Sequence, residues 1–508
     1  MAPFASAHSK NSGISVFLTI QKQKVFYFTR KERRLFMELL NSIVDGINTL
    51  LWSYVLIVVL VGSGIYFTLS TKFVQLRMLP EMVRLLTEGV GAKTKGSSVN
   101  SFQAFCVSTA SRVGVGNIAG VAIAIVTGGP GAVFWMWVIA FIGAATGFVE
   151  STLAQVYKIQ RPDGSFHGGP AYYIKNALHQ PGIAKLFAVL LSVTFGLIYN
   201  SVQANTIALS ASTAFNVPQS VTAGVLAFFT GLVICGGVQR IAQVTEFLVP
   251  IMAGLYILVA IIITIMNIDQ VPAMFALILH DAFSPQAAVG GGLGSVILTG
   301  VKRGLFSNEA GEGSVPNAAA TADVSHPVKQ GLIQSFGVYV DTWLVCSATA
   351  FIVLLTGQYT VGGELTGIAL AQASLASIFG ASAPAAVAFM ILLFAFSSIV
   401  GNYYYSEINI AFFEGNSKMG LYLFRALVIG MVVFGSMAEL SLVWNLADLF
   451  MGLLCLTNLY AIARLYKYVQ VTFNSYLEQK KQGNAEPVFD PAILPNEHGI
   501  HAWGVDKD

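Results

Sequence analysis

The chain of 508 residues has little charge: Asp, Glu, Lys and Arg together make up 10% of it, whereas soluble globular chains carry about 25%. So little charge excludes a soluble enzyme, a nucleic-acid-binding protein and a disordered chain, because each needs a charged or polar surface. Hydrophobic residues make up 55% of the sequence, and its mean hydropathy is +0.69. The composition therefore predicts an all-α protein that crosses a membrane several times.

Cysteine and histidine are also scarce. The four cysteines lie in apolar stretches without the paired spacing of a metal site, and the seven histidines lie in loops and tails. Neither a haem nor a zinc site can be built from them, and the sequence contains no nucleophile–base set or nucleotide-binding loop. We therefore expect a protein that is not an enzyme and has no cofactor.

Eleven stretches are long and apolar enough to cross a bilayer, which takes about 20 residues. They are residues 44–69, 101–126, 130–157, 184–214, 217–238, 241–266, 287–310, 330–356, 384–411, 420–438 and 441–466. Residues 357–383 are too polar to span, and we expect them to form a helical loop at the membrane surface.

Basic residues predict the orientation of these spans. Lys and Arg occur in the loops at 70–100, 158–184, 239–240, 311–329 and 412–419 and in the tail after residue 466. The five loops on the other side contain neither residue. Because cytoplasmic loops carry the excess of Lys and Arg, the pattern predicts that the N-terminus is outside and the C-terminus cytoplasmic.

Residues 1–36 contradict this orientation, because they carry seven basic residues that it places outside. Either this extension is a cytoplasmic anchor or the protein starts at Met37, and we favour Met37. We therefore expect three parts: the basic extension at 1–36, a membrane domain at 37–469 and a flexible cytoplasmic tail at 470–508.

Glycine interrupts two of the spans. The glycines are Gly114, Gly116 and Gly120 in the second span, together with Asn117, and Gly300, Gly304 and Gly311 in the seventh. Glycine in mid-membrane permits a helix to unwind around a cavity, although it also permits close packing of two intact helices. Because the interrupted spans lie five apart, we predict an inverted repeat of segments 2–6 and 7–11, with the first span as an additional helix.

Polar side chains inside the spans indicate binding sites, since each is costly unless it is paired or used. Asn200 and Gln203 are three residues apart on one helix face, so their amides can meet both charges of a zwitterion or bond a neighbouring helix. Ser397 and Ser398, with the carbonyl of Phe394 one turn earlier, suit a small hard cation. Serine pairs also serve in helix packing.

Charged residues inside the spans are few. Arg112, just before the interruption of the second span, could close the cytoplasmic side through an ion pair or form a structural pair with an acid. The acids within or at the ends of spans are Glu150, Glu246, Glu309, Glu312, Asp341 and Glu407. Glu309 and Glu407 are the alternatives for a proton relay.

Five stretches carry a resemblance to a known family. They are SRVGVGNIAGVAIAIVTGGPGAVFWMWV (111–138), HGGPAYYI (167–174), NSVQANTIA (200–208), RGLFSNEAGEGSVPNAAATADVSHPVKQG (303–331) and FAFSSIVGNYYYSE (394–407). The chain closely resembles the alanine or glycine:cation symporters, sodium-coupled amino-acid carriers of the bacterial and archaeal plasma membrane. The resemblance covers about residues 38–470 and implies the leucine-transporter fold class, whose two broken helices match the second and seventh spans. Members usually begin near the position of Met37.

The resemblance also implies the residues that bind the ligands. Backbone amides at the first break would hold the substrate carboxylate, Gln203 would face the substrate, and Phe306 would limit the size of its side chain. With Asn200, added by the helix-face argument, the expected substrate residues are Gly114, Val115, Gly116, Asn117, Asn200, Gln203, Phe306, Ser307 and Asn308. Many members have Thr in place of Val115, so only backbone roles are expected there. The implied sodium ligands are the carbonyls of Ala110, Val113 and Phe394 and the hydroxyls of Ser397 and Ser398.

The resulting prediction is a sodium-coupled symporter that imports alanine, glycine or a similar small neutral amino acid across a bacterial-type plasma membrane by alternating access. Its partners are the amino acid, sodium as coupling ion and the lipid bilayer, and nucleic acid is excluded. A proton-coupled transporter of the same fold, using an intramembrane acid, is the alternative. A channel is less favoured because no charged pore ring or filter motif occurs in the sequence.

Overall fold

The computed structural model describes residues 30–91, 98–236, 238–284, 292–413, 418–495 and 499–503. The chain divides into two compact units, Met1–Ile47 and Asn48–Asp508. The described part of the first unit belongs to helix α2 (Arg30–Leu50). The basic extension expected at 1–36 therefore lies outside the described residues as far as residue 29, and α2 begins within its last residues.

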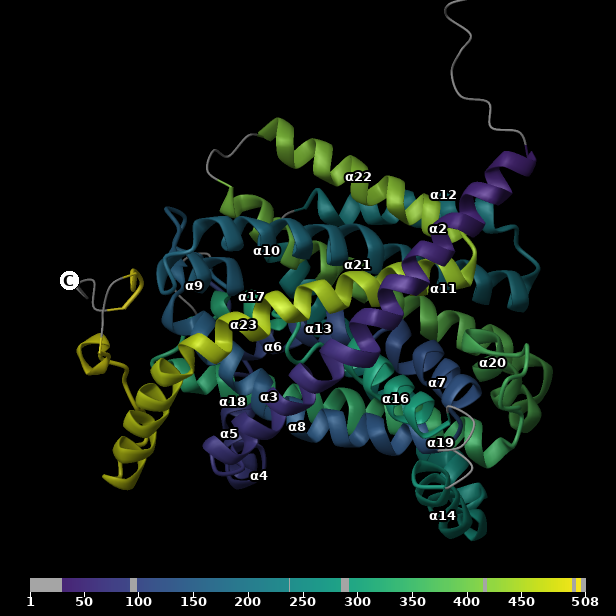
Figure 1. Cartoon of the computed structure of the whole chain (residues 1–508), viewed down its shortest axis with the longest axis horizontal. Helices are drawn as coiled ribbons and strands as arrows, with labels where there is room; N and C mark the ends of the chain where they lie inside the picture. Colours follow the sequence, from purple (N-terminus) through teal and green to yellow (C-terminus); the bar gives the residue numbers. More distant parts are fainter. Residues whose placement is uncertain are drawn as a thin grey trace, which may run out of the picture. The chain divides into compact units, whose positions relative to one another are not determined.

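Helices dominate the second unit (Figure 1). Its first part contains η1 (Leu51–Leu56), α3 (Ile57–Ser70), α4 (Val74–Arg77), α5 (Leu79–Glu88), α6 (Ser101–Arg112), η2 (Gly116–Gly120), α7 (Val121–Gly128) and α8 (Gly131–Val156). The middle part contains β1 (Ile159–Gln160), β2 (Phe166–His167), α9 (Pro170–Asn176), α10 (Pro181–Val193), η3 (Thr194–Tyr199), α11 (Asn200–Phe215), α12 (Gln219–Ile234), α13 (Val238–Met266), η4 (Ile268–Gln270) and α14 (Val271–Ala282). The two short strands pair antiparallel, with Ile159 opposite His167.

The last part of the chain is also helical. It contains α16 (Gly292–Asn308), α17 (Val315–Thr321), α18 (Pro327–Val338), η5 (Tyr339–Cys346), α19 (Ser347–Thr356), α20 (Gly367–Phe379), η6 (Gly380–Ser382), α21 (Ala383–Phe412), α22 (Lys418–Met437), α23 (Leu440–Lys481) and η7 (Pro491–Ile493). The elements η1, η3 and η5 are π-helical turns inside longer helices, and η2 is a π-helical turn at the start of the helix that continues as α7. Such turns often mark functional sites.

Eight helices of the described residues are long and apolar enough to cross a membrane, and a bent pair raises the number to nine. They are Asn41–Ser70, Gly131–Val156, Pro181–Phe215, Thr245–Met266, Pro327–Thr356, Gly367–Phe412, Lys418–Met437 and Leu440–Lys481, and the pair is Ser101–Arg112 with Gly116–Gly128. The pair bends by 49°, so the break expected in the second span is present. A polytopic helical membrane protein is thus confirmed, whereas the eleven spans and the inverted repeat stay predictions.

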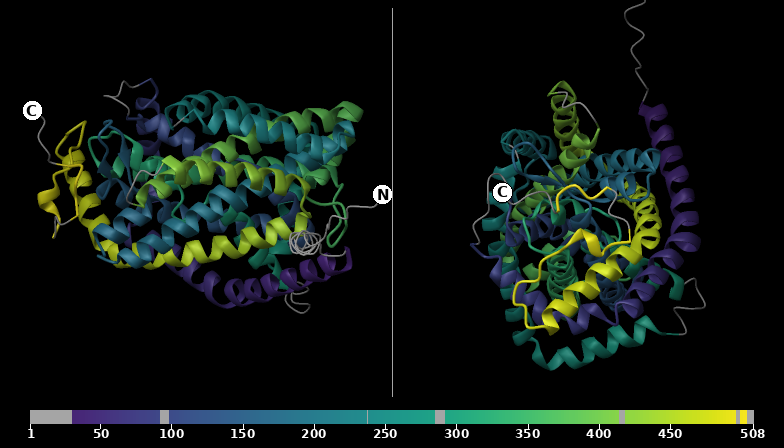
Figure 2. Two further views of the ribbon diagram at one scale, coloured as in Figure 1. Left: turned by 90° about the horizontal axis from the view of Figure 1, so that it is seen from above. Right: turned by 90° about the vertical axis from the view of Figure 1, so that its left-hand side faces the viewer.

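Two groups of helices carry the packing of the second unit. α8 packs against α3, α16 and α18, whereas α21 packs against α10, α11 and α13 (Figure 1). α6 contacts members of both groups, namely α18 of the first and α13 and α21 of the second. The 42-residue α23 runs along the bundle (Figure 2). The broken second span therefore lies where the two groups meet.

The break in the seventh span lies later than expected. α16 runs without interruption through Gly300 and Gly304 and ends at Asn308. Residues 309–314 then leave the helix before α17 begins, and Gly311 among them has a φ of +101°. The prediction of interruptions at Gly300 and Gly304 is therefore wrong, and only Gly311 belongs to the break.

Packing explains the two misread glycines. A Cβ on Gly300 would lie 2.6 Å from the carbonyl oxygen of Ala132, and one on Gly304 would lie 2.4 Å from a methyl carbon of Ile139. Both contacts belong to α8, so the glycines permit close approach of α16 to α8. Gly300 and Gly304 therefore permit close helix packing, which is the alternative to helix unwinding.

Three connections carry more helix than a simple loop. Residues 357–383 contain the expected helix, α20, whose inner side is buried against α19 and α21, and its position at the membrane surface stays a prediction. α17 lies inside the loop expected at 311–329 and is buried throughout. The boundary expected between residues 469 and 470 falls inside α23, which continues to Lys481.

Candidate functional site

The break in the second span exposes backbone groups that neighbouring side chains then satisfy. α6 ends at Arg112, residues 113 and 114 leave the helix, and the helical path resumes at Val115, just before η2. The N–H of Gly114 donates to Oδ1 of Asn117 (2.8 Å), and the N–H of Val115 donates to Oε1 of Gln203 (3.1 Å). Two of the amides expected to face a substrate carboxylate are thus bonded to side-chain oxygens in this structure.

Three of the predicted cation ligands, Ala110, Phe394 and Ser398, lie together between α6 and α21. The Ser398 hydroxyl donates to the carbonyls of Ala110 (2.9 Å) and Phe394 (3.1 Å), and the Ser397 hydroxyl donates to the Phe394 carbonyl (2.8 Å). Val113 lies at the end of α6, two residues before the Val115 amide. The structure therefore brings hydroxyl and carbonyl oxygens of two separate helices to one buried place.

Asp341 connects the two breaks. Its Oδ1 accepts from the Asn117 amide (2.7 Å) and its Oδ2 accepts from the Ser307 hydroxyl (2.7 Å) and the Thr342 hydroxyl (2.8 Å). The Asn308 amide also donates to the Thr342 hydroxyl (3.3 Å). The sequence places Asp341 among the intramembrane acids but does not indicate this role, because its partner Asn117 lies 224 residues away.

The second break is stabilised by carboxylates. Glu309, whose φ is +56°, accepts from the hydroxyls of Ser111 (2.8 Å) and Ser314 (2.6 Å). Glu150 of α8 accepts from the N–H of Gly311 (3.2 Å). The Tyr199 hydroxyl donates to Glu312 at 3.2 Å. These acids therefore satisfy hydroxyl and backbone donors that the break exposes.

The sequence leaves alternatives open for the roles of Arg112 and Asn200. Arg112 donates to the Gln334 side chain (2.6 Å) and the Ser108 hydroxyl (3.1 Å), and the ion pairs among the described residues do not include it. Asn200 accepts from the Asn402 amide (3.1 Å) of α21 and donates to the Gly196 carbonyl (3.0 Å). Arg112 is therefore held by polar neutral groups, and Asn200 bonds a neighbouring helix.

Aromatic rings surround Phe306. Its ring centre lies 4.7 Å from that of Tyr199 and 4.7 Å from that of Trp444. A Cβ on Gly116 would lie 2.9 Å from the Phe306 ring. Phe306 therefore stands directly against the first break, where a ring can limit the size of a bound molecule.

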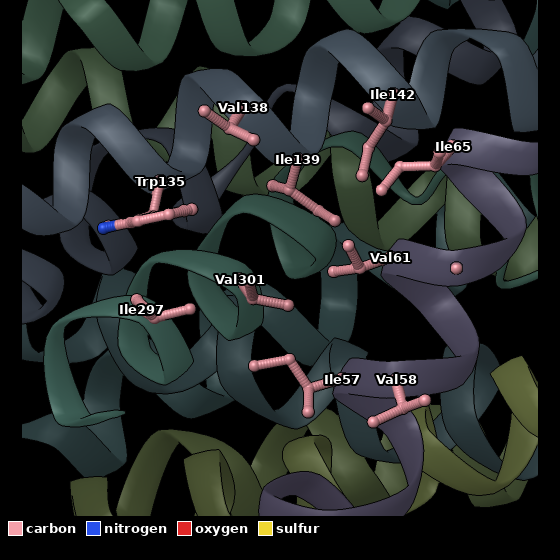
Figure 3. Close-up of a pocket in the computed structure, with 11 residues that line it drawn as sticks. Ile57, Val58, Val61, Ile65, Trp135, Val138, Ile139, Ile142, Ile297 and Val301 are labelled. Carbon is pink, nitrogen blue, oxygen red and sulfur yellow. The ribbon is translucent and has the colours of Figure 1, made fainter. Parts of the chain in front are cut away.

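An apolar cavity of about 380 Å³ lies elsewhere, between α3, α8 and α16 (Figure 3). Its lining is aliphatic apart from Trp135, whose indole N–H donates to the Ala282 carbonyl (3.4 Å). Figure 3 shows side chains such as Ile57, Ile139 and Val301 pointing toward one another. Such walls cannot meet the charges of an amino acid, so this cavity is not the candidate site.

Comparison with known proteins relates the chain to transporters. The model of the sodium:alanine symporter family matches residues 37–491. The "Probable sodium/glutamine symporter GlnT" of Bacillus subtilis (strain 168) is 51% identical over 468 residues, which cover 92% of this chain and 97% of the relative. The "Sodium/proton-dependent alanine carrier protein" of Bacillus sp. (strain PS3) is 40% identical over 82% of this chain and 95% of the relative.

One solved structure shows the same fold. It is a crystal structure of a mutant of the manganese transporter of Eremococcus coleocola, with a TM-score of 0.50 and 13% sequence identity. The match covers 71% of this chain and 78% of that chain. At this identity the likeness concerns the fold alone, and the assignment to the leucine-transporter class stays a prediction.

Proposed function

The chain belongs to the sodium:alanine symporter family, and on that premise we propose that it imports small neutral amino acids together with sodium by alternating access. As a member it is a multi-pass membrane transporter and not an enzyme. The observation that carries the proposal is the junction of the two interrupted helices, where Asp341 bonds both Asn117 and Ser307. A ligand held at this junction would contact residues of both interrupted helices.

The proposed substrate site uses the break at Gly114, Val115, Gly116 and Asn117. Burying a zwitterion costs several kcal/mol unless both of its charges are met. A substrate carboxylate that accepts from the Gly114 and Val115 amides would replace the side-chain oxygens now bonded there. The oxygen of Gln203 is then released and can accept from the substrate ammonium group.

The second break completes this site. Phe306 stands against Gly116 and limits the room for a substrate side chain, while Ser307 and Asn308 anchor the end of α16 to Asp341 and Thr342. Asn200 stays among the proposed substrate residues, and in this structure its side-chain oxygen accepts from Asn402.

We place sodium among the oxygens of Ala110, Val113, Phe394, Ser397 and Ser398. Hydroxyl and carbonyl oxygens suit a hard cation, and an ion there would tie α6 to α21. Because α6 also leads into the substrate site, sodium and substrate each raise the affinity of the other by the same factor. This coupling is the basis of symport.

A proton-coupled mechanism is the second candidate. The relative from strain PS3 is named as sodium/proton-dependent, and the buried Glu309 bonds Ser111 of α6 and Ser314 beside its own break. A carboxylate in that position can couple its protonation to the geometry of the breaks. Uptake driven by a pH gradient without sodium would favour this candidate.

Two further features belong to the proposal. The excess of Lys and Arg in alternate loops supports an outside N-terminus and a cytoplasmic C-terminus. The transporter domain is proposed at 37–469, and the family match to 37–491 supports its first residue while extending beyond its last.

Uptake into proteoliposomes tests the proposal. We expect an inward sodium gradient to drive accumulation of radiolabelled alanine, and a matched choline gradient to drive none. Ser397→Ala should raise the sodium concentration needed for half-maximal uptake about tenfold, because one ligand of the ion is lost. Gln203→Ala should weaken uptake at every sodium concentration, because it removes a substrate contact.

Ser436→Ala is the matched control, since this buried serine also donates to a carbonyl of its own helix but lies in α22. Unchanged sodium dependence in Ser397→Ala would remove the cation site from this place. Accumulation under a proton gradient alone would replace sodium by a proton as the coupling ion.

A further inference from the structure

Two buried donors beside the proposed substrate site have no acceptor within the described part of the chain. They are Nη1 of Arg303 in α16 and the indole Nε1 of Trp444 in α23. The two residues are 5% and 6% exposed, so water reaches neither well. Buried polar groups in native proteins are nearly always paired. Two unpaired donors side by side can together bind one acceptor oxygen.

The donors belong to one stacked cluster with Phe306. The Cζ of Arg303 lies 4.5 Å from the ring centre of Trp444 and 5.9 Å from that of Phe306. The rings of Phe306 and Trp444 lie 4.7 Å apart, and Phe306 contacts Gly116 of the first break. A Cβ on Gly120 would lie 3.4 Å from the Trp444 ring, so both aromatic rings stand against η2 and the two donors lie beside the proposed substrate site.

Charges around the cluster define the acceptor. Nη2 of Arg303 bonds Asp448, and Nζ of Lys302 lies 3.8 Å from the other oxygen of that carboxylate. Asp448 follows Trp444 by one turn of α23. A side-chain amide can accept from the free donors through its oxygen and donate to Asp448 through its nitrogen, whereas a carboxylate has no donor for Asp448.

We propose that Arg303 and Trp444 form a subsite that binds the carbonyl oxygen of a substrate side chain, so that the protein selects amide-bearing amino acids of the glutamine type. This inference rests on the proposed transport function and extends its substrate class from alanine to a neutral amino acid with a longer, amide-bearing side chain. The amide nitrogen of such a side chain can donate to Asp448 at the same time. Alanine is too short to reach the subsite, and methionine has the length of glutamine without a carbonyl oxygen.

Selectivity follows from the unpaired donors. A site that is built to hydrogen-bond a substrate group discriminates against analogues that lack it, because its own buried donors then stay unpaired. We therefore expect L-glutamine to compete for uptake better than L-methionine, and L-glutamate to compete worst of the three.

Trp444→Phe tests the subsite, because it keeps a ring for stacking against Arg303 and Phe306 and removes only the indole donor. In sodium-driven proteoliposome uptake we expect the KM for L-glutamine to rise about tenfold. The KM for L-alanine should stay within about twofold, and this value also reports that the variant is folded. Arg303→Lys, which keeps a positive charge for Asp448 but removes the planar guanidinium with its Nη1 donor, should raise the glutamine KM as well.

Equal changes in both KM values, or no change in either, would overturn the subsite. Sodium-driven uptake of alanine without uptake or binding of glutamine would also overturn it and leave the transport function intact. Binding alone is measured by thermal unfolding in detergent with sodium, where L-glutamine should raise the Tm of the unsubstituted protein more than L-methionine does. If no substrate accumulates but this difference is present and is lost in Trp444→Phe, the transport proposal fails and the subsite stands.

Discussion

Single residues set the geometry of the first break, and Gly114 leaves the least room. A Cβ at this position would lie 2.2 Å from the Ser398 hydroxyl oxygen and 3.0 Å from Oε1 of Gln203. Both of these side chains belong to the proposed ligand sites, one for sodium and the other for the substrate. Only glycine therefore permits the backbone to approach both sites.

Gly114→Ala should reduce sodium-driven alanine uptake to less than about a tenth of its original rate, because the added methyl group displaces Ser398 or Gln203. Uptake is measured at equal amounts of protein in the membrane. Gly254→Ala is the control, since a Cβ on this α13 glycine would meet nothing within 4 Å. Near-normal uptake by Gly114→Ala would contradict the close approach.

At the scale of helices, glycine permits two helices to pack closely. α16 and α8 pack closely along Gly300, where an added Cβ would lie 2.6 Å from a backbone oxygen that cannot move without the helix. The π-helical turns η2, η3 and η5 loosen other helices near the candidate site, while α16 stays regular up to Asn308. The close packing of α16 against α8 thus ends at Asn308, where the second break begins.

Gly300→Ala should destabilise the protein by about 1–3 kcal/mol, the usual cost of overpacking a close contact. Thermal unfolding in detergent would show this as a lower Tm. Gly62→Ala in α3 is the matched control, because nothing lies within 4 Å of a Cβ there. Equal Tm values for the two variants would show that α16 can move away from α8 without cost.

At the scale of the molecule, charged contacts join segments that are far apart in the sequence. Glu81 of α5 accepts from Arg84 (2.8 Å) and from the hydroxyl of Tyr476 (2.5 Å), and Lys480 lies 3.3 Å away. Hydrogen bonding to Arg84, followed by that to Tyr476, lowers the pKa of Glu81 to about 2 against the cost of partial burial. The ionised carboxylate therefore stabilises the contact between α5 and the end of α23.

This contact predicts a pH dependence of stability. The contribution of Glu81 is complete above the ordinary pKa of 4.5 and is lost as the pH falls from there toward 2. Glu81→Gln should cost about 1 kcal/mol at pH 7, after allowance for solvent screening. Its Tm difference from the unsubstituted protein should shrink as the pH falls below 4.5, whereas the exposed Glu478→Gln should show little difference at any pH. A difference that persists at pH 2 would refute the charged contact.

The C-terminal segment also joins distant parts. The side-chain amide of Gln479 makes two hydrogen bonds with the backbone of Val488: it donates to the carbonyl (2.8 Å) and accepts from the N–H (2.9 Å). The indole of Trp503 donates to the Gln155 carbonyl (2.8 Å) at the end of α8. Described residues after α23 therefore contact α23 and α8, and the flexible cytoplasmic tail stays a prediction.

The sequence by itself determined the class of protein, the helical architecture and the first break. A chain this apolar must form helices, because a helix satisfies its own backbone hydrogen bonds in lipid. This requirement does not depend on how the helices pack against one another. The break at Gly114–Asn117 was predictable because glycine and the following asparagine act locally: the Asn117 side chain accepts from the Gly114 amide three residues earlier. A contact between residues this close in the sequence can be predicted from the sequence alone.

Only the tertiary structure decided which glycines break a helix and which donors stay unpaired. Gly300 and Gly311 look alike in the sequence, but one faces the backbone of α8 and the other lies in the break, with a φ of +101°. Asp341 gains its role from a partner 224 residues away, and Arg303 meets Trp444 across two helices. Contacts of this range depend on how the helices pack, because helix periodicity determines which face a residue occupies and leaves open which neighbour that face meets.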